Sequence, residues 1–178
     1  MGFLRTILGK DTTTDVCELL TTQHTEVDAL FEQLEKREGD TRAAFYDLAN
    51  KLAAHAGAEE KVFYPAVMTP DTKELLQESV EEHLAIKRVL ADLITMKLDD
   101  DAFHAKLSVL KEQVSHHAHD EEEKNLFPKL RATMSADQRA ALGNEVLVAF
   151  EDLMESQPYK HVPQEIQQAA PLPPASSR

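Results

Sequence analysis

Four segments of this sequence place apolar residues at the spacing of one helical face, and each places one histidine in that apolar stripe. The first segment begins at Asp15, with Glu18 in the capping-box position, and the second begins near Asp40. A turn at 69–71 precedes the third segment, and the acidic run 99–101 precedes the fourth. The histidines of the stripes are His24, His55, His83 and His117. Long segments joined by short links predict an all-α fold, an antiparallel up-down-up-down four-helix bundle.

Composition agrees with helices and narrows the classes of partner. The 178 residues include only five Gly and no Trp, which favours helices over sheets. With 32 acidic and 19 basic residues the formal net charge is -13, which repels phosphate backbones and anionic lipid. We therefore expect no nucleic-acid partner, no membrane partner and a cytoplasmic location. One cysteine, Cys17, leaves no intramolecular disulfide and no cysteine-based metal cluster.

The chain outside the four segments adds a helix and a tail. We divide the sequence into an N-terminal arm (1–14), the bundle (15–131), an additional C-terminal helix packed on the bundle (135–157) and an extended or disordered tail (158–178). Ser135 caps the additional helix, and Gly143 is expected to interrupt it. Pro, Gln and Ser are frequent in the tail, a composition that does not build a core. The tail is where we expect a protein partner to bind, if the chain has one.

The four stripe histidines indicate a metal site. One buried histidine is usually a core residue, but four at similar depth are costly unless each ring nitrogen has a partner. A transition metal would be a partner for all four. Glu59 lies four residues after His55, so both side chains stand on one helical face. Four nitrogens and two carboxylates suit two divalent ions bridged by the carboxylates, and this ligand set indicates iron, with manganese or zinc left open.

The second carboxylate follows His117, in a segment that resembles the one at His55. The first segment reads HAGAEEKVFYP and the second HAHDEEEKNLFP, so the step from histidine to proline is ten residues in one and eleven in the other. A helix can absorb one extra residue as a single-turn π-bulge, which would turn Glu122 inward. A regular four-residue step would instead select Glu121. We favour Glu122 and keep Glu121 as the alternative.

This order of residues resembles the hemerythrin and HHE cation-binding family over residues 15–131. The similarity includes QHTEVDALF around His24, EEKVFYP after His55, EEHLAIKRVL around His83 and EEEKNLFPKL after His117. The resemblance implies a non-haem di-iron centre, two iron ions with an oxo or hydroxo bridge and two bridging carboxylates. Family members that carry dioxygen have a further histidine where this chain has Ser79, so one iron should lack a nitrogen ligand. That departure shifts our expectation from reversible carriage toward redox turnover or sensing.

Our leading hypothesis is therefore a di-iron protein that binds or turns over a small diatomic or peroxide ligand, namely hydrogen peroxide, dioxygen or nitric oxide. Such turnover would be catalase-like or another peroxide or nitric oxide redox activity. The alternative is an iron, oxygen or redox sensor, or an iron-binding module without turnover, and a metal-free bundle is a third reading. We expect Glu60 and Glu123 to face solvent, with a role as an extra carboxylate at an open site as the alternative. We expect Tyr64 to be a packing residue, with a part in redox chemistry beside an open iron as the alternative. His104, His116 and His119 are expected on the surface, and the alternative for His116 and His119 is a hydrogen bond to a metal ligand.

Overall fold

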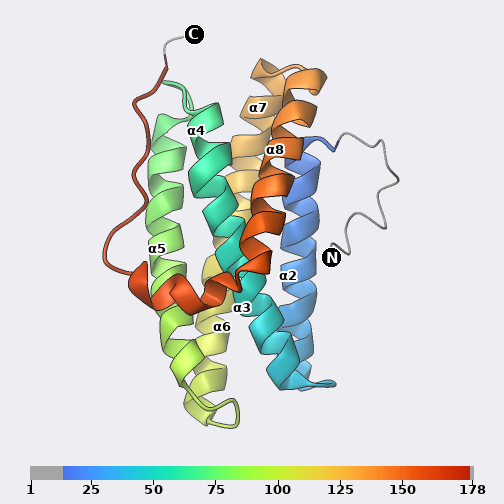
Figure 1. The fold of residues 1–178 in the computed structure, drawn as a ribbon, viewed down its shortest axis with the longest axis vertical. Helices are drawn as coiled ribbons and strands as arrows, with labels where there is room; N and C mark the ends of the chain where they lie inside the picture. The colour runs from blue at the N-terminus through green and yellow to red at the C-terminus, as the bar shows by residue number, and fades with distance from the viewer. Residues whose placement is uncertain (1–13, 177–178) are drawn as a thin grey trace.

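The computed structural model describes residues 14–176, so nearly all of the predicted N-terminal arm lies outside the described residues. Regular structure in this range is helical throughout, as predicted. Four long rods form the bundle: α2 (Val16–Lys36); α3 (Thr41–Ala58) with η1 (Glu59–Phe63) and α4 (Tyr64–Val67); α5 (Lys73–Thr95); and α6 (Asp101–Ser115) with η2 (His116–Leu126) and α7 (Phe127–Thr133). Successive rods run in opposite directions and are joined by short links (Figure 1). The predicted four-helix bundle with an additional C-terminal helix is confirmed.

Side-chain caps begin three of the four rods where the sequence signals predict, whereas α5 begins without one. Asp15 Oδ1 accepts from the backbone N–H of Cys17, and Asp40 Oδ1 accepts from that of Ala43. Asp100 caps α6 in the same way. Each cap satisfies a backbone donor that the first helical turn leaves without a partner.

The additional helix, α8 (Ala136–Glu155), lies across α2 and α3 (Figure 1). It buries Leu142, Val146 and Phe150 against apolar residues of those two rods. The interruption expected at Gly143 was wrong, because α8 is continuous through it. A Cβ at Gly143 would lie 2.0 Å from the carbonyl oxygen of Thr14. Glycine is therefore needed where the backbone just before α2 approaches α8 closely.

Two apolar clusters fill the bundle, and the polar stripe residues lie between them. In α2, Leu20 belongs to one cluster and Val27 to the other, with His24 between them. In α5, Val80 and Ile86 flank His83 in the same way. None of the helices within residues 14–176 has the length and apolar character that a membrane crossing requires.

The C-terminal segment has more structure than its composition predicts. Pro158–Gln164 forms a 3-10 helix, η3, where we expected an extended or disordered tail. Val162 from this helix is buried in the second apolar cluster, which explains why it folds onto the bundle. Beyond η3 the chain runs back along α5, where Arg88 Nε donates to the carbonyl of Ile166 and the backbone N–H of Ser176 lies 3.4 Å from the Met68 carbonyl oxygen (Figure 1).

Candidate metal centre

The structure brings six of the seven predicted site residues together in the middle of the bundle. His24 comes from α2, His55 and Glu59 from α3 and η1, His83 from α5, and His117 and Glu122 from η2. All six are buried, and the two carboxylates have no exposed surface. The remaining candidate, Glu121, lies outside this group.

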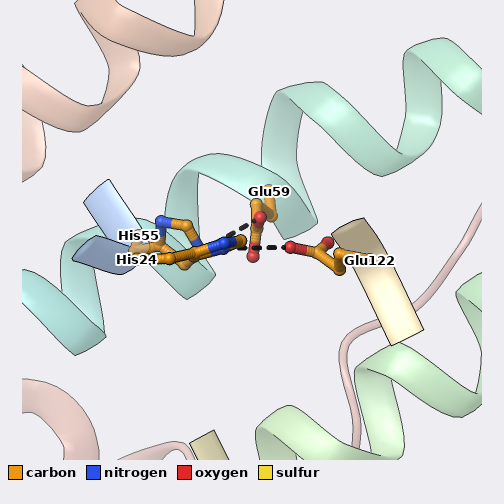
Figure 2. Close-up of side chains that lie close together, drawn as sticks. All are labelled: His24, His55, Glu59 and Glu122. Atoms are coloured by element: carbon orange, nitrogen blue, oxygen red, sulfur yellow. Dashed lines mark ion pairs between the residues drawn. The ribbon is translucent and has the colours of Figure 1, made fainter. Parts of the chain in front are cut away.

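The first set of donor atoms is built from two histidines and one oxygen of each glutamate. His55 Nε2 lies 3.1 Å from Glu59 Oε1, and His24 Nε2 lies 3.3 Å from Glu122 Oε2. Figure 2 shows both imidazoles pointing toward the two carboxylates. These four atoms lie within 4.8 Å of one another. They form one compact N₂O₂ donor set.

The second set uses the other two histidines and the other oxygens. His83 Nε2 lies 3.2 Å from Glu59 Oε2 and 2.9 Å from His117 Nε2. Glu59 therefore presents one oxygen to each pair of histidines. Glu122 is divided likewise, with Oε2 near His24 and Oε1 directed toward the hydroxyl of Tyr64 beside the second pair.

Tyr64, which we expected mainly to be a packing residue, lies at the site. Its hydroxyl oxygen lies 3.1 Å from Glu122 Oε1, 3.3 Å from His83 Nε2 and 3.4 Å from His117 Nε2. The ring stacks on His83 at a centroid distance of 5.5 Å. Phe127 holds the equivalent place in the other motif and stacks on His24 at 6.3 Å, but it has no hydroxyl. The second set thus gains an oxygen that the first set lacks.

The unpaired atoms of the site fit a metal ion. Among residues 14–176, four buried atoms of the first set have no hydrogen bond of acceptable geometry: His24 Nε2, His55 Nε2, Glu59 Oε1 and Glu122 Oε2. The nitrogen and oxygen of each pair lie 3.1 Å apart for His55 and Glu59 and 3.3 Å apart for His24 and Glu122, close enough for an ion pair but not aligned as a hydrogen bond. Buried polar atoms without partners are costly, and neutral imidazole and carboxylate together are typical ligands of a transition metal.

The Nδ1 atom of each histidine, on the side of the ring away from the centre, contacts a side-chain oxygen. His24 contacts Glu123 at 2.7 Å, and His55 contacts Gln23 at 2.7 Å. His83 contacts Glu60 at 3.0 Å, and His117 contacts Glu82 at 2.8 Å. An Nδ1–H donated to an outer oxygen leaves Nε2 as a lone-pair donor that faces the centre, which is the arrangement metal-binding histidines use.

These outer contacts correct two expectations. Glu60 and Glu123 were expected to face solvent, but each turns inward to the histidine of a neighbouring rod. They directly follow Glu59 and Glu122, so in each motif two adjacent glutamates supply one inner and one outer oxygen. The adjacent glutamates EE after His55 and EEE after His117 were the sequence signal for these outer contacts. His119 also contacts Glu123, at 3.1 Å, and is only partly exposed.

Two π-helical segments aim the inner glutamates. The distortion predicted after His117 is confirmed, but it is larger than a single-turn bulge: η2 spans 11 residues and starts at His116. A second π segment, the 5-residue η1, was not predicted. Each ends with a bond to a carbonyl five residues back, from the N–H of Tyr64 to Glu59 and from that of Phe127 to Glu122. Each inner glutamate is therefore hydrogen-bonded through its backbone carbonyl to the aromatic residue that stacks on a histidine of the site.

Glu121 and Ser79 point elsewhere. Glu121 Oε1 lies 3.9 Å from His116 Nε2 at the rim of the bundle, while Glu122 is fully buried. Ser79 donates its hydroxyl to the carbonyl of Leu75 in its own helix at 2.9 Å. The nearby Tyr64 hydroxyl is the group that reaches the second donor set.

The electrostatics of the cluster favour positive charge at its centre. Burial lowers the pKa of His24, but the carboxylates of Glu122 and Glu123 outweigh it and raise the pKa to about 9. For His83 burial again lowers the pKa, and Glu59 and Glu60 raise it to about 9. Burial raises the pKa of Glu59, whereas His55 and His83 hold it well below its usual range. A buried site with this charge pattern attracts cations.

A small cavity lies beside the four histidines. Its volume is about 30 Å³, and apart from the histidines its lining is mostly apolar, including Val27, Leu52 and Ile86. Gln23 is one of its polar lining residues. The volume is close to that of one water molecule, so the cavity accepts only a very small ligand.

Comparisons with known proteins point to one family. The family model described as Hemerythrin HHE cation binding domain matches residues 15–130. A crystal structure of a hemerythrin HHE cation-binding domain-containing protein from Mycobacterium kansasii superposes with a TM-score of 0.71 at 21% identity, covering 83% of this chain and 92% of that one. A protein named DNA nickase from Nostoc sp. is 28% identical over 141 residues, which is 76% of this chain but only 39% of that protein's length.

Proposed function

The chain belongs to the hemerythrin HHE cation-binding domain family, and from that premise we propose that its buried cluster binds two iron ions and that the loaded centre binds or turns over a small oxidant, namely hydrogen peroxide, dioxygen or nitric oxide. The observation that carries this proposal is the division of Glu59, whose two oxygens face different pairs of histidines. A carboxylate placed in this way suits a bridge between two ions.

The residues of the chain fall into two ligand groups. His24 and His55 would hold one ion, and His83 and His117 the other, with Glu59 and Glu122 shared between them. Tyr64 would bring its hydroxyl oxygen to the second ion and so take the part of the histidine that dioxygen-carrying members have where this chain has Ser79. When bound, the two irons would supply the electrons for reduction of an oxidant or the coordination for its capture.

Other parts of the chain select and protect the ligand. The cavity of about 30 Å³ limits entry to molecules of a few atoms, which supports a small oxidant over an organic substrate. Phe63, Phe127 and Leu126 are buried around the opposite side of the site and keep water out. The outer oxygens of Glu60, Glu82 and Glu123 orient the imidazoles.

Metal analysis and peroxide addition test this function. Protein produced in iron-replete medium should carry about two irons per chain, because six ligands divided into two sets suit a pair of ions. Added hydrogen peroxide should then release oxygen gas over many turnovers. Folded protein with one iron or none would contradict the dinuclear site, and bleaching by a stoichiometric amount of peroxide without gas release would contradict turnover.

A sensor without turnover is the second candidate, and one connection in the structure favours it. Lys87 is buried and pairs with Glu60 at 2.8 Å, while Glu60 contacts His83. Lys87 also pairs with Glu165, just after η3, at 3.2 Å. This chain of charges links a proposed iron ligand to the C-terminal segment, where a protein partner would bind. Different protease sensitivity of residues 158–178 in the oxidised and reduced iron-loaded protein, together with stoichiometric bleaching, would support the sensor.

The name of the Nostoc relative does not enter the proposal. This chain spans 39% of that protein, so the activity in its name need not reside in the shared part. The net charge of -13 also opposes binding to a phosphate backbone.

A further inference from the structure

The outer contacts of the four histidines follow a repeated pattern with one exception. The residue before His83 is Glu82, and it holds His117; the residue before His24 is Gln23, and it holds His55. Three of the four outer partners are carboxylates, and Gln23 alone is an amide. The repeat makes the amide stand out as a chemical difference at one of four equivalent places.

A second contact of each outer partner shows what the difference does. Glu60 Oε2 also binds Lys87, Glu82 Oε1 lies 3.3 Å from His116, and Glu123 Oε1, the atom that contacts His24, also lies 3.1 Å from His119. Gln23 has no such second contact: its Nε2 is buried and has no hydrogen-bond partner among residues 14–176. The residue is only 4% exposed, so bulk water does not reach this nitrogen, and a partner would have to occupy the adjoining cavity.

The hydrogen bond to His55 decides which end of the amide is left over. A histidine that ligates through Nε2 carries its proton on Nδ1, so the atom of Gln23 at 2.7 Å must be the acceptor oxygen. The amide nitrogen, with two N–H donors, then remains for another ligand. Gln23 also lines the cavity of about 30 Å³ beside the four histidines.

We propose that Gln23 is a ligand-binding residue whose Nε2–H donates a hydrogen bond to a small, lone-pair-bearing ligand in this cavity, so that the centre prefers hydrogen-bond acceptors over apolar molecules of the same size. This inference rests on the proposed function, because it requires a ligand beside the metal centre. Asp28 also lines the cavity, but its Oδ2 is already engaged by His119 at 2.9 Å. Apart from the histidines, whose Nε2 atoms would bind metal, Gln23 is therefore the lining residue of the described chain with an uncommitted nitrogen.

Azide binding to the iron-loaded protein tests the proposal, since azide is a small acceptor with a strong infrared stretch. Gln23→Met removes the donor without adding charge and should weaken azide binding about tenfold or more, the usual effect of losing a hydrogen bond to a charged partner. Gln113→Met is the matched control, because this glutamine of α6 does not line the cavity, and it should bind azide like the unmodified chain.

Iron content and the infrared spectrum separate the donor role from support of His55. Gln23→Glu keeps an oxygen for His55 Nδ1 and should retain about two irons, yet it should still bind azide weakly. In the unmodified chain and in Gln113→Met, D₂O should shift the azide stretch through the exchanged amide protons, and both Gln23 variants should lose most of that shift. Azide affinity and D₂O shift unchanged in Gln23→Met, or restored in Gln23→Glu, would overturn the proposal. Unmodified protein that takes up no iron would refute the proposed function itself, and iron-loaded unmodified protein that binds no azide would refute the Gln23 inference.

Discussion

The Nε2 atoms of His83 and His117 lie 2.9 Å apart, while their Nδ1 atoms contact the carboxylates of Glu60 and Glu82. When both imidazoles donate through Nδ1, their Nε2 atoms need a proton or a metal cation between them. In the metal-free protein His83 supplies that proton, since burial lowers its pKa but Glu59 and Glu60 raise it to about 9, and a bound metal ion would replace the proton. The same two rings also approach the Tyr64 hydroxyl. The two Nε2 atoms and the Tyr64 hydroxyl oxygen therefore lie together at one buried point.

Loss of one of these rings should therefore release iron. We expect His117→Ala to lower iron affinity by more than the roughly 10- to 100-fold that loss of an outer hydrogen-bond partner costs. His104→Ala is the control, because His104 lies outside the cluster, toward the start of α6. Iron per chain after dialysis against a weak chelator measures the effect. Equal retention in the two variants would show that His117 is not a ligand.

The two neighbouring glutamates of η2 should differ sharply. Glu122→Ala removes a fully buried carboxylate that faces both histidine pairs, and most iron should be lost because two cations would then share less negative charge. Glu121→Ala removes a carboxylate at the rim, 3.9 Å from His116, and should leave about two irons per chain. Metal analysis of both variants after identical purification decides between them. Greater loss in Glu121→Ala would place the ligand there.

Tyr64→Phe should affect the two ions unequally. Its hydroxyl lies among Glu122, His83 and His117, so its loss removes an oxygen from one donor set only. We expect iron content to fall from about two toward one per chain while the helical content stays unchanged. Tyr46→Phe is the control, since Tyr46 packs on Phe45 and Tyr159 away from the cluster. Two tightly retained irons in Tyr64→Phe would mean that the phenol is only a packing group.

Gly143→Ala should destabilise the fold without touching the cluster. A Cβ there would meet the Thr14 carbonyl oxygen at 2.0 Å, which forces α8 away from the start of α2, and overpacking of this kind costs about 1 to 3 kcal/mol. Gly57→Ala is the comparison, because its Cβ would meet only the end of the Leu153 side chain at 3.0 Å. Urea denaturation should show a clear loss for Gly143→Ala and a small change of either sign for Gly57→Ala. Equal midpoints would contradict the close-approach argument.

The fold and most of the central residues could be predicted from local patterns in the sequence. Apolar spacing and cap residues such as Asp15 and Asp40 act locally, through helical geometry and the first turn's free donors, so they can be read without the partner helices. One histidine in each stripe pointed to a common centre for the same reason. The extra residue after His117 even predicted a π distortion, since it changes the register within a single helix.

Which atoms meet could not be predicted from these local patterns. We expected Glu60 and Glu123 to face solvent because a helical stripe describes one helix, whereas their partners His83 and His24 come from other rods. The same is true of Tyr64, whose hydroxyl contacts histidines that come from α5 and η2. Val162 is buried in the second apolar cluster and so packs η3 on the bundle, although the surrounding composition predicted an extended or disordered tail. Local periodicity determines which side of a helix is buried, but contacts between distant segments depend on how the rods pack, and packing is a property of the whole chain.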